Sequence, residues 1–222
     1  MTSPLRLPDL MPDFAHVRAW VFDLDNTLYP PAMRLFDQIE VRMTEFVRRT
    51  VGGTEAEADR LRKAYWAQYG TTLAGLMREH DVDADAYLEE VHDISFDALA
   101  PDPYLAECIK ALPGRRIVYT NGSAPYAARV LEARGLSAAF DAIYGVEHAG
   151  YAPKPEAGAF RRIFARDGLD PRAAAMFEDD PRNLAAPHQM GMRTVHVAET
   201  PVEAPHVQHF TDDLGAFLSR LR

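Results

Sequence analysis

The sequence predicts an α/β fold, a doubly wound parallel sheet with an all-helical segment inserted after its first strand. Short, nearly continuous apolar runs recur along the chain, as expected of parallel strands covered on both faces. Helical patterns separate the later runs, and this alternation is typical of a parallel sheet. A long interval after the first run carries helical patterns and no clear strand, which indicates the insertion.

Five segments are predicted to be buried strands of this sheet. Most are unbroken apolar runs, because a strand covered on both faces has no side that needs polar residues. The segments are Ala19–Leu24, Arg116–Thr120, Ala142–Val146, Ala174–Glu178 and Thr194–Ala198.

Start and stop signals place helices between the later strands. Ser123 can cap a helix that Gly135 ends. Pro155 lies where a second helix can begin, and Gly168 ends that pattern. A short third helix is predicted to begin at Pro181 and to end near residue 191.

The interval 31–100 is predicted to be a separate helical module. Apolar residues from Ala32 to Val47 fall on one helical stripe, and further helices are predicted over Glu55–Tyr69, Leu73–His80 and Ala84–His92. Pro101 marks the point at which the chain returns to the core. We therefore expect residues 1–30 and 101–222 to form the core, with 31–100 inserted.

Composition narrows the class of protein. A length of 222 residues suits one core domain with a smaller module, and 47% hydrophobic residues can build a sizeable core. No apolar run approaches the roughly 20 residues that span a bilayer, and the N-terminus does not have the pattern of a signal peptide. The single cysteine, Cys108, excludes an intrachain disulfide framework. These features favour a cytoplasmic protein without a membrane partner.

The net charge of −9 argues against a nucleic acid polymer as a partner, because affinity for one rests on clustered Lys and Arg. A small anion is still possible, since a metal ion and a few local donors can hold one phosphate. Lysine occurs only at Lys63, Lys110 and Lys154, while Arg supplies the other basic residues. A lysine in a motif is therefore notable in this chain.

The segment FDLDNTLYP, residues 22–30, places two carboxylates directly after the first predicted strand. Ligands of open α/β sheets bind outside the carboxyl ends of the strands. Residues two apart at a strand end point to the same side, so Asp23 and Asp25 can face one site. At ~4 Å and an effective dielectric of ~20, two such charges repel by ~4 kcal/mol, which a divalent cation would relieve. Taken alone, the pair could also be turn aspartates.

Three later motifs follow other predicted strands. Thr120 and Asn121 offer polar groups and backbone amides at a helix start, which suits phosphate oxygens. Lys154, between two prolines, is a compact positive charge for a phosphate. The acidic run 178–180 suits a hard cation such as Mg²⁺, and Asn183 lies one helical turn later. Each motif alone has an ordinary structural explanation, but their order along the sheet indicates one phosphate and metal site.

In this order, the four motifs resemble the haloacid dehalogenase (HAD) superfamily. The resemblance covers about Val17 to Val197, and the DxDxT pattern at 23–27 is highly specific once the later motifs follow. It implies a Rossmann-like doubly wound parallel sheet with a helical cap inserted after the first motif. It also implies Mg²⁺ as the cofactor and hydrolysis of phosphate monoesters as the activity.

The resemblance implies a role for each matching residue. Asp23 is the nucleophile that forms an aspartyl-phosphate, and Asp25 is the acid/base for the leaving oxygen and then for water. The phosphoryl group is held by Thr120, Asn121 and Lys154. The Mg²⁺ ligands are Asp23, the backbone carbonyl of Asp25, and Asp179, supported by Thr27, Asp180 and Asn183.

The insertion narrows the resemblance to pyrimidine 5′-nucleotidases. The segment YWAQYGTTLAGLMREH, 65–80, and VHD, 91–93, look like the cap of that branch, and DNTLYP and FEDDPRNL also fit it. The substrate is then a nucleoside monophosphate of the UMP or CMP type. Gly70 breaks a helix just before two hydroxyl residues, so a leaving-group pocket is predicted from Tyr65, Tyr69, Thr71 and Thr72.

Other interpretations stay open at this point. The core motifs are compatible with another small-molecule phosphatase or a sugar-phosphate mutase of the same superfamily. A haloacid dehalogenase fits less well, because an acid/base two residues after the nucleophile suits phosphate chemistry. A phospho-accepting receiver module is a non-enzyme alternative, although the insertion of ~70 residues exceeds what one compact module of that kind needs. We expect a monomer or a homodimer.

Overall fold

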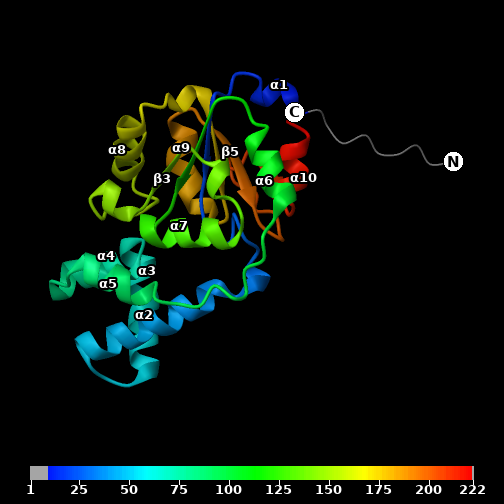
Figure 1. The fold of residues 1–222 in the computed structure, drawn as a ribbon. Coiled ribbons are helices and arrows are strands. Elements are labelled where there is room, and N and C mark those ends of the chain that lie inside the picture. The colour runs from blue at the N-terminus through cyan, green and yellow to red at the C-terminus, as the bar shows by residue number, and fades with distance from the viewer. Residues whose placement is uncertain (1–9, 222) are drawn as a thin grey trace.

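The computed structural model describes residues 10–221 and contains a six-stranded parallel sheet (Figure 1). The strand order is β3-β2-β1-β4-β5-β6, so the chain winds outward from β1 in both directions. This doubly wound arrangement confirms the predicted fold class and brings the carboxyl ends of all strands to one edge. The strands are β1 (Ala19–Phe22), β2 (Arg115–Tyr119), β3 (Ala142–Tyr144), β4 (Ala174–Glu178), β5 (Arg193–Val197) and β6 (His209–Thr211).

Alternate side chains of the central strand enter two different apolar cores. Trp20 and Phe22 pack into one cluster, while Ala19 and Val21 pack into the other. All four residues of β1 are buried. Burial on both faces explains why this part of the sequence is an unbroken apolar run rather than an alternating one.

Helices cover both faces of the sheet. The cluster that contains Trp20 includes residues of α1, α6, α7 and α10, and the other cluster includes residues of α8 and α9. Ser123 caps α7 as predicted, whereas the helix expected from Pro155 begins at Ala157 with Glu156 as its N-cap. The core helices are α1 (Met11–Phe14), α6 (Pro103–Lys110), α7 (Ala124–Ala133), α8 (Ala157–Asp167), α9 (Ala185–Gln189) and α10 (Leu214–Ser219), and the 3₁₀ turns are η1 (Pro31–Met33), η2 (Ser137–Ala139), η3 (Val146–Ala149), η4 (Pro171–Ala173) and η5 (Pro181–Leu184).

Between β1 and α6 the chain forms a group of four helices apart from the sheet, in the lower part of Figure 1. On the first of them, Ile39, Phe46 and Val47 of the predicted apolar stripe are buried, whereas Ala32 is exposed and lies in η1, before the helix begins. A capping box at Thr54 and Glu57 starts the second helix. We call these four helices the insertion: α2 (Leu35–Val51), α3 (Glu55–Tyr69), α4 (Thr72–His80) and α5 (Ala84–Val91).

The predicted strands are confirmed to within two residues at each end, and one strand was missed. β6 spans only His209–Thr211, too short a segment for a periodic pattern to stand out. It pairs with β5 in parallel and extends the sheet at one edge.

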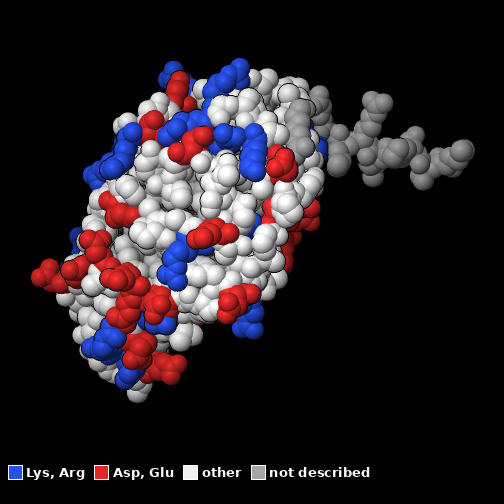
Figure 2. Space-filling view, in the orientation of Figure 1, with Lys and Arg blue, Asp and Glu red and all other residues white. Residues whose placement is uncertain are grey.

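Charged side chains cover the surface unevenly. Figure 2 shows acidic side chains gathered over the lower left of the molecule, where the insertion lies, with basic side chains among them. Basic side chains gather over the upper part of this face, on the core. Among the helices of residues 10–221, none is long and apolar enough to cross a membrane.

Candidate active site

Asp23 lies directly beyond the end of β1, in the middle of the sheet. Its backbone N–H donates to the carbonyl of Phe177 on β4 at 2.9 Å, which continues the strand pairing by one residue. The Asp23 residue is only 4% exposed, and the hydroxyl of Thr27 lies 3.5 Å from its Oδ2. The carboxylate is therefore held at the carboxyl edge of the sheet, as the motif predicts.

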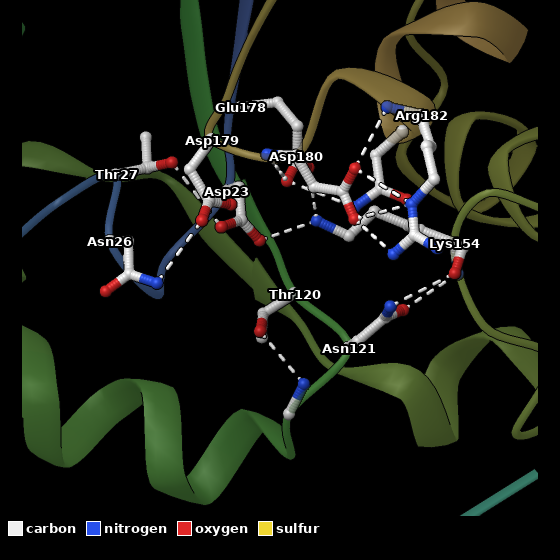
Figure 3. Close-up of polar contacts among 12 residues, drawn as sticks. Asp23, Asn26, Thr27, Thr120, Asn121, Lys154, Glu178, Asp179, Asp180 and Arg182 are labelled. Atoms are coloured by element: carbon white, nitrogen blue, oxygen red, sulfur yellow. Dashed lines mark hydrogen bonds and ion pairs between the residues drawn. The ribbon is translucent and has the colours of Figure 1, made fainter. Parts of the chain in front are cut away.

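Lys154 reaches the same point from the loop between η3 and α8 (Figure 3). Its Nζ lies 2.5 Å from Oδ1 of Asp23 and 2.6 Å from Oε2 of Glu178, and the residue is 1% exposed. Burial acts to lower the pKa of Lys154, but the two adjacent carboxylates outweigh it and raise that pKa, so the ammonium stays charged. A buried cation is thus fixed against Asp23.

Asn121 holds the loop that carries this lysine. Its Oδ1 accepts from the backbone N–H of Lys154 at 2.8 Å, and its Nδ2 donates to the Lys154 carbonyl at 3.1 Å. Both groups of the amide therefore bond to the backbone of this loop, and the residue also lines the cavity described below. Thr120, which is 1% exposed, also lines the cavity, and its Oγ1 accepts from the N–H of Gly122 at 2.9 Å.

Three carboxylates gather around this lysine. Ligand oxygens of Asp23, Glu178 and Asp179 lie within 4.8 Å of one another. Burial, assisted by Glu178, raises the pKa of Asp23 to about 8. Burial also raises the pKa of Glu178 and of Asp179 to about 7. One ammonium compensates only part of the charge, and an all-oxygen donor set of this kind fits a hard divalent cation such as Mg²⁺.

Neighbouring polar groups orient the acidic run. Asn26 donates from Nδ2 to Oδ2 of Asp179 at 3.2 Å, and Asn183 donates to Oε1 of Glu178 at 3.1 Å. Asp180 points away from the cluster: its Oδ1 caps η5 through the N–H of Arg182, and the two side chains form an ion pair at 2.6 Å. Asp180 therefore orders the turn that follows the cluster.

Asp25 is held by two tyrosines that the sequence analysis did not single out. The hydroxyls of Tyr29 and Tyr126 donate to Oδ1 of Asp25 at 2.6 and 2.7 Å. Burial raises the pKa of Asp25, and the two phenol hydrogen bonds act against that rise. Tyr29 belongs to the FDLDNTLYP motif itself, but Tyr126 lies on α7, about a hundred positions along the chain.

A cavity of about 420 Å³ joins this cluster to the insertion. Asp23, Asp25, Lys154 and Asp179 line its sheet side. Thr71 and Thr72, which were predicted for a leaving-group pocket, also line this cavity; Thr71 caps α4 by accepting from the N–H of Ala74 at 3.1 Å. The lining from the insertion further includes Phe36, Glu40, Met43, Arg62, Lys63, Trp66, Leu73, Tyr87, Leu88 and Val91.

The two predicted pocket tyrosines do not reach the cavity. The Tyr65 ring packs against Gly75 of α4, and its hydroxyl lies 2.7 Å from Nε2 of His80. Tyr69 is half-buried and donates to Oε1 of Glu79 on α4 at 2.5 Å. Their spacing places both residues on the face of α3 that packs on α4, so they belong to the scaffold of the insertion.

Other aromatic residues line the cavity in their place. Tyr87 of α5 is 2% exposed, and its hydroxyl is a buried polar atom without a hydrogen-bond partner in the described chain. Trp66 of α3 is 49% exposed and stacks under the guanidinium of Arg182, 3.8 Å from the ring centroid. No local sequence pattern indicates that Tyr87 or Trp66 lines the cavity. Aromatic residues one helical turn apart look alike in the sequence, although only some of them face the cavity.

Comparisons with known proteins identify the family that the chain matches. A model of the haloacid dehalogenase-like hydrolases matches residues 17–191. "Phosphate metabolism protein 8" of Saccharomyces cerevisiae is 28% identical over 214 residues, which cover 89% of this chain and 66% of the yeast protein. The chain thus spans about two thirds of the length of this curated relative.

Solved structures show the same fold at low identity. A HAD phosphatase from Thermococcus onnurineus superposes with a TM-score of 0.62 at 19% identity, covering 92% of this chain and 98% of that one. The L-2-haloacid dehalogenase from Xanthobacter autotrophicus superposes with a TM-score of 0.57 at 18% identity, covering 91% and 97%. These two proteins differ in reaction, so the likeness concerns the fold.

Proposed function

We propose that this chain, which belongs to the haloacid dehalogenase-like hydrolase family, is a Mg²⁺-dependent phosphomonoesterase that acts through a phosphorylated Asp23. One observation carries the proposal. Asp23 and Lys154 form a buried pair at 2.5 Å beside two further carboxylates, at the inner end of a cavity large enough for a small ester. A carboxylate and a fixed cation in that position suit attack on a phosphorus atom.

In the first half of the reaction, a carboxylate oxygen of Asp23 attacks phosphorus in line with the ester oxygen. The P–O bond to the leaving group breaks as the bond to Asp23 forms. Lys154 stabilises the charge on the transferring oxygens, and its burial makes that charge more effective than it would be in water. Asp25 donates a proton to the departing oxygen, so that a poor leaving group such as a sugar can depart as an alcohol.

In the second half, Asp25 takes a proton from water as the water oxygen attacks phosphorus. The bond between phosphorus and Asp23 breaks, inorganic phosphate leaves, and the Asp23 carboxylate is restored. One carboxyl group can serve both steps because it ends the first step deprotonated. The cavity between sheet and insertion limits the access of other water molecules to the intermediate.

Asp23, Glu178 and Asp179 would hold Mg²⁺, and the backbone carbonyl of Asp25 remains a predicted ligand. When bound, the ion supplies charge neutralisation for the phosphoryl oxygens. Glu178 has a second task, because both of its oxygens already accept hydrogen bonds: Oε2 from Lys154, and Oε1 from Asn183 and the backbone N–H of Asp180. It therefore links the position of the lysine to that of the acidic cluster.

The insertion side of the cavity supports a nucleoside as the leaving group, and we propose pyrimidine nucleoside 5′-monophosphates as the preferred substrates. The Tyr87 hydroxyl is buried and unpaired, with Thr72 beside it but not in a hydrogen bond of normal geometry. Buried polar groups are nearly always paired, so this hydroxyl suits a polar atom of a ligand. Arg62, 3.0 Å from Glu40, adds a donor and acceptor pair nearby.

A substrate panel tests the proposal. With Mg²⁺, kcat/KM should be measured for UMP, CMP, AMP, GMP, sugar phosphates and an aryl phosphate, with release of inorganic phosphate as the readout. We expect hydrolysis of the aryl phosphate and the highest values for UMP or CMP. Higher values for sugar phosphates would transfer the proposal to another phosphatase of the family. Conversion of a sugar phosphate to its isomer without phosphate release would indicate a mutase.

A further inference from the structure

The two oxygens of the Asp25 carboxyl group have different surroundings. Oδ1 accepts from Tyr29 at 2.6 Å and from Tyr126 at 2.7 Å, and the two hydroxyl oxygens are 3.5 Å apart. Among the described residues, none donates a hydrogen bond to Oδ2, while Asp25 lines the cavity. One oxygen is therefore occupied by protein and the other is free for a reactant.

Both tyrosines are fixed by packing. Each is 1% exposed. Tyr29 belongs to the segment that carries Asp25, and Tyr126 lies in the first turn of α7, where its ring stacks on His92 at 4.2 Å and an angle of 7°. His92 follows α5, and its Nδ1 lies 3.2 Å from the hydroxyl of Ser123. The residue that supports Tyr126 therefore belongs to the segment through which the chain leaves the insertion.

We propose that Tyr29 and Tyr126 are positioning residues that make Oδ2 of Asp25 the oxygen that carries the transferred proton. The inference rests on the proposed function. Two O–H donors already occupy the lone pairs of Oδ1, so a proton on that oxygen would displace at least one of these two hydrogen bonds. Two hydrogen bonds to rigid side chains also prevent the carboxyl group from rotating, so that Oδ2 keeps one orientation.

This arrangement lets a single oxygen serve both steps. In the first, the O–H bond at Oδ2 breaks and its proton goes to the ester oxygen as the P–O bond breaks. In the second, Oδ2 takes a proton from the water whose oxygen bonds to phosphorus, as the bond between phosphorus and Asp23 breaks. Asp25 needs no rotation between the steps, because Oδ1 stays bound to the two phenols throughout.

The test removes the hydroxyls and keeps the rings. Tyr29→Phe, Tyr126→Phe and the double variant should be compared with the wild type in single-turnover release of phenol from phenyl phosphate and of nitrophenol from 4-nitrophenyl phosphate. Phenol is the poorer leaving group and needs the acid more. We expect the double variant to lose ~10- to 10²-fold on phenyl phosphate and less than ~3-fold on 4-nitrophenyl phosphate. KM should change little.

Tyr144→Phe is the matched control, because its hydroxyl donates to Asp167 at 2.9 Å outside the cavity. It should leave both rates unchanged. Equal losses on the two esters, or no loss on either, would overturn the inference for Tyr29 and Tyr126. If the double variant does not fold, each single variant should still lose more activity on phenyl phosphate than on 4-nitrophenyl phosphate, by a smaller factor than expected for the double variant. A wild type that hydrolyses neither ester with Mg²⁺ refutes the proposed function itself, whereas an active wild type with uniform losses refutes only the inference.

Discussion

On the sheet side of the cavity, Asp23, Lys154 and Glu178 are at most 4% exposed, and the lysine meets the two carboxylates at 2.5 and 2.6 Å. On the insertion side burial varies: Tyr87 is 2% exposed and the Arg62 side chain 8%, but other charged and aromatic groups are far more open. Trp66 is 49% exposed, and the side chain of Lys63 is 64% exposed. The same cavity thus has one wall of buried, mutually paired charges and one wall with exposed side chains.

This difference in burial indicates which side of the cavity tolerates substitution. Removing one member of a buried ion pair leaves a charge without compensation, which typically costs ~3–5 kcal/mol of stability. An exposed residue that lines a cavity is tied to the fold by few contacts, and substitution there usually changes stability by less than ~0.5 kcal/mol. The sheet side therefore suits a fixed chemistry, and the insertion side suits selection of the leaving group.

The largest effect is expected for Asp23→Asn, which tests whether the sheet side performs the chemistry. An amide cannot form the phosphorylated intermediate, so phosphatase activity should fall to the background of the assay while the protein stays folded. Phosphate release from an aryl ester and a melting curve provide the two measurements. Asp212→Asn, at an exposed position near the C-terminal helix, should retain full activity. Turnover near that of the wild type in Asp23→Asn would disprove the assignment.

Lys154→Met should have the next largest effect. Loss of one fixed donor to a transition-state oxyanion costs about 10²- to 10³-fold in kcat. The substitution also leaves the buried carboxylates of Asp23 and Glu178, and the partly buried one of Asp179, without their cation, so the melting temperature in EDTA should fall and Mg²⁺ should restore part of the loss. Lys110→Met, which removes an exposed lysine paired with Glu107 at 3.4 Å, is the control. Activity unchanged in Lys154→Met would remove the lysine from the reaction.

The sequence could predict the sheet side because strand ends are local signals. Asp23, Thr120 and the acidic run from Glu178 directly follow apolar runs, and parallel strands end at a common edge. The side chains at those strand ends therefore lie close together, whatever the conformation of the loops that connect the strands. Lys154 lies on a loop, and its motif was informative because lysine is rare in this chain.

The insertion side could not be predicted in the same way. Helical periodicity shows that Tyr65 and Tyr87 are buried, but not whether each contacts another helix or a cavity. The structure separates them: Tyr65 packs on α4, and Tyr87 lines the cavity. The pairing of Tyr126 with Asp25 joins residues on distant segments, and no local pattern in either segment indicates it.

Metal binding should give the third effect, a stabilisation that depends on pH. The carboxyl pKa values of about 8, 7 and 7 lie above the ordinary values of 3.8 for Asp23 and Asp179 and 4.5 for Glu178. The folded metal-free protein therefore binds more protons than the unfolded chain between about pH 4 and 8, and its stability falls as the pH rises through that range.

Because Mg²⁺ competes with those protons, its stabilising effect should be larger at pH 8 than at pH 6. A concentration of 100 Kd would contribute ~2.7 kcal/mol to the free energy of unfolding. Melting temperatures with Mg²⁺ and with EDTA at both pH values measure the effect. Asp179→Asn, which removes one candidate ligand, should lose most of the Mg²⁺ response. An identical response to Mg²⁺ at pH 6 and pH 8 would contradict the carboxylate site.

The smallest effect is expected on the insertion side, from Tyr87→Phe, and it sharpens the comparison most. The substitution removes one hydroxyl that has no partner in the described chain, so stability should stay the same or rise slightly. If that hydroxyl contacts the leaving group, kcat/KM for UMP should fall by about 10-fold, the cost of one hydrogen bond, while an aryl phosphate reacts as before.

Tyr65→Phe is the matched control outside the cavity. It should lower stability through the lost contact with His80 without altering the ratio of kcat/KM for the two substrates. If Tyr87→Phe lowers kcat/KM equally for both substrates, Tyr87 shapes the cavity without binding the leaving group. Selection of the base would then depend on other residues of the insertion that line the cavity.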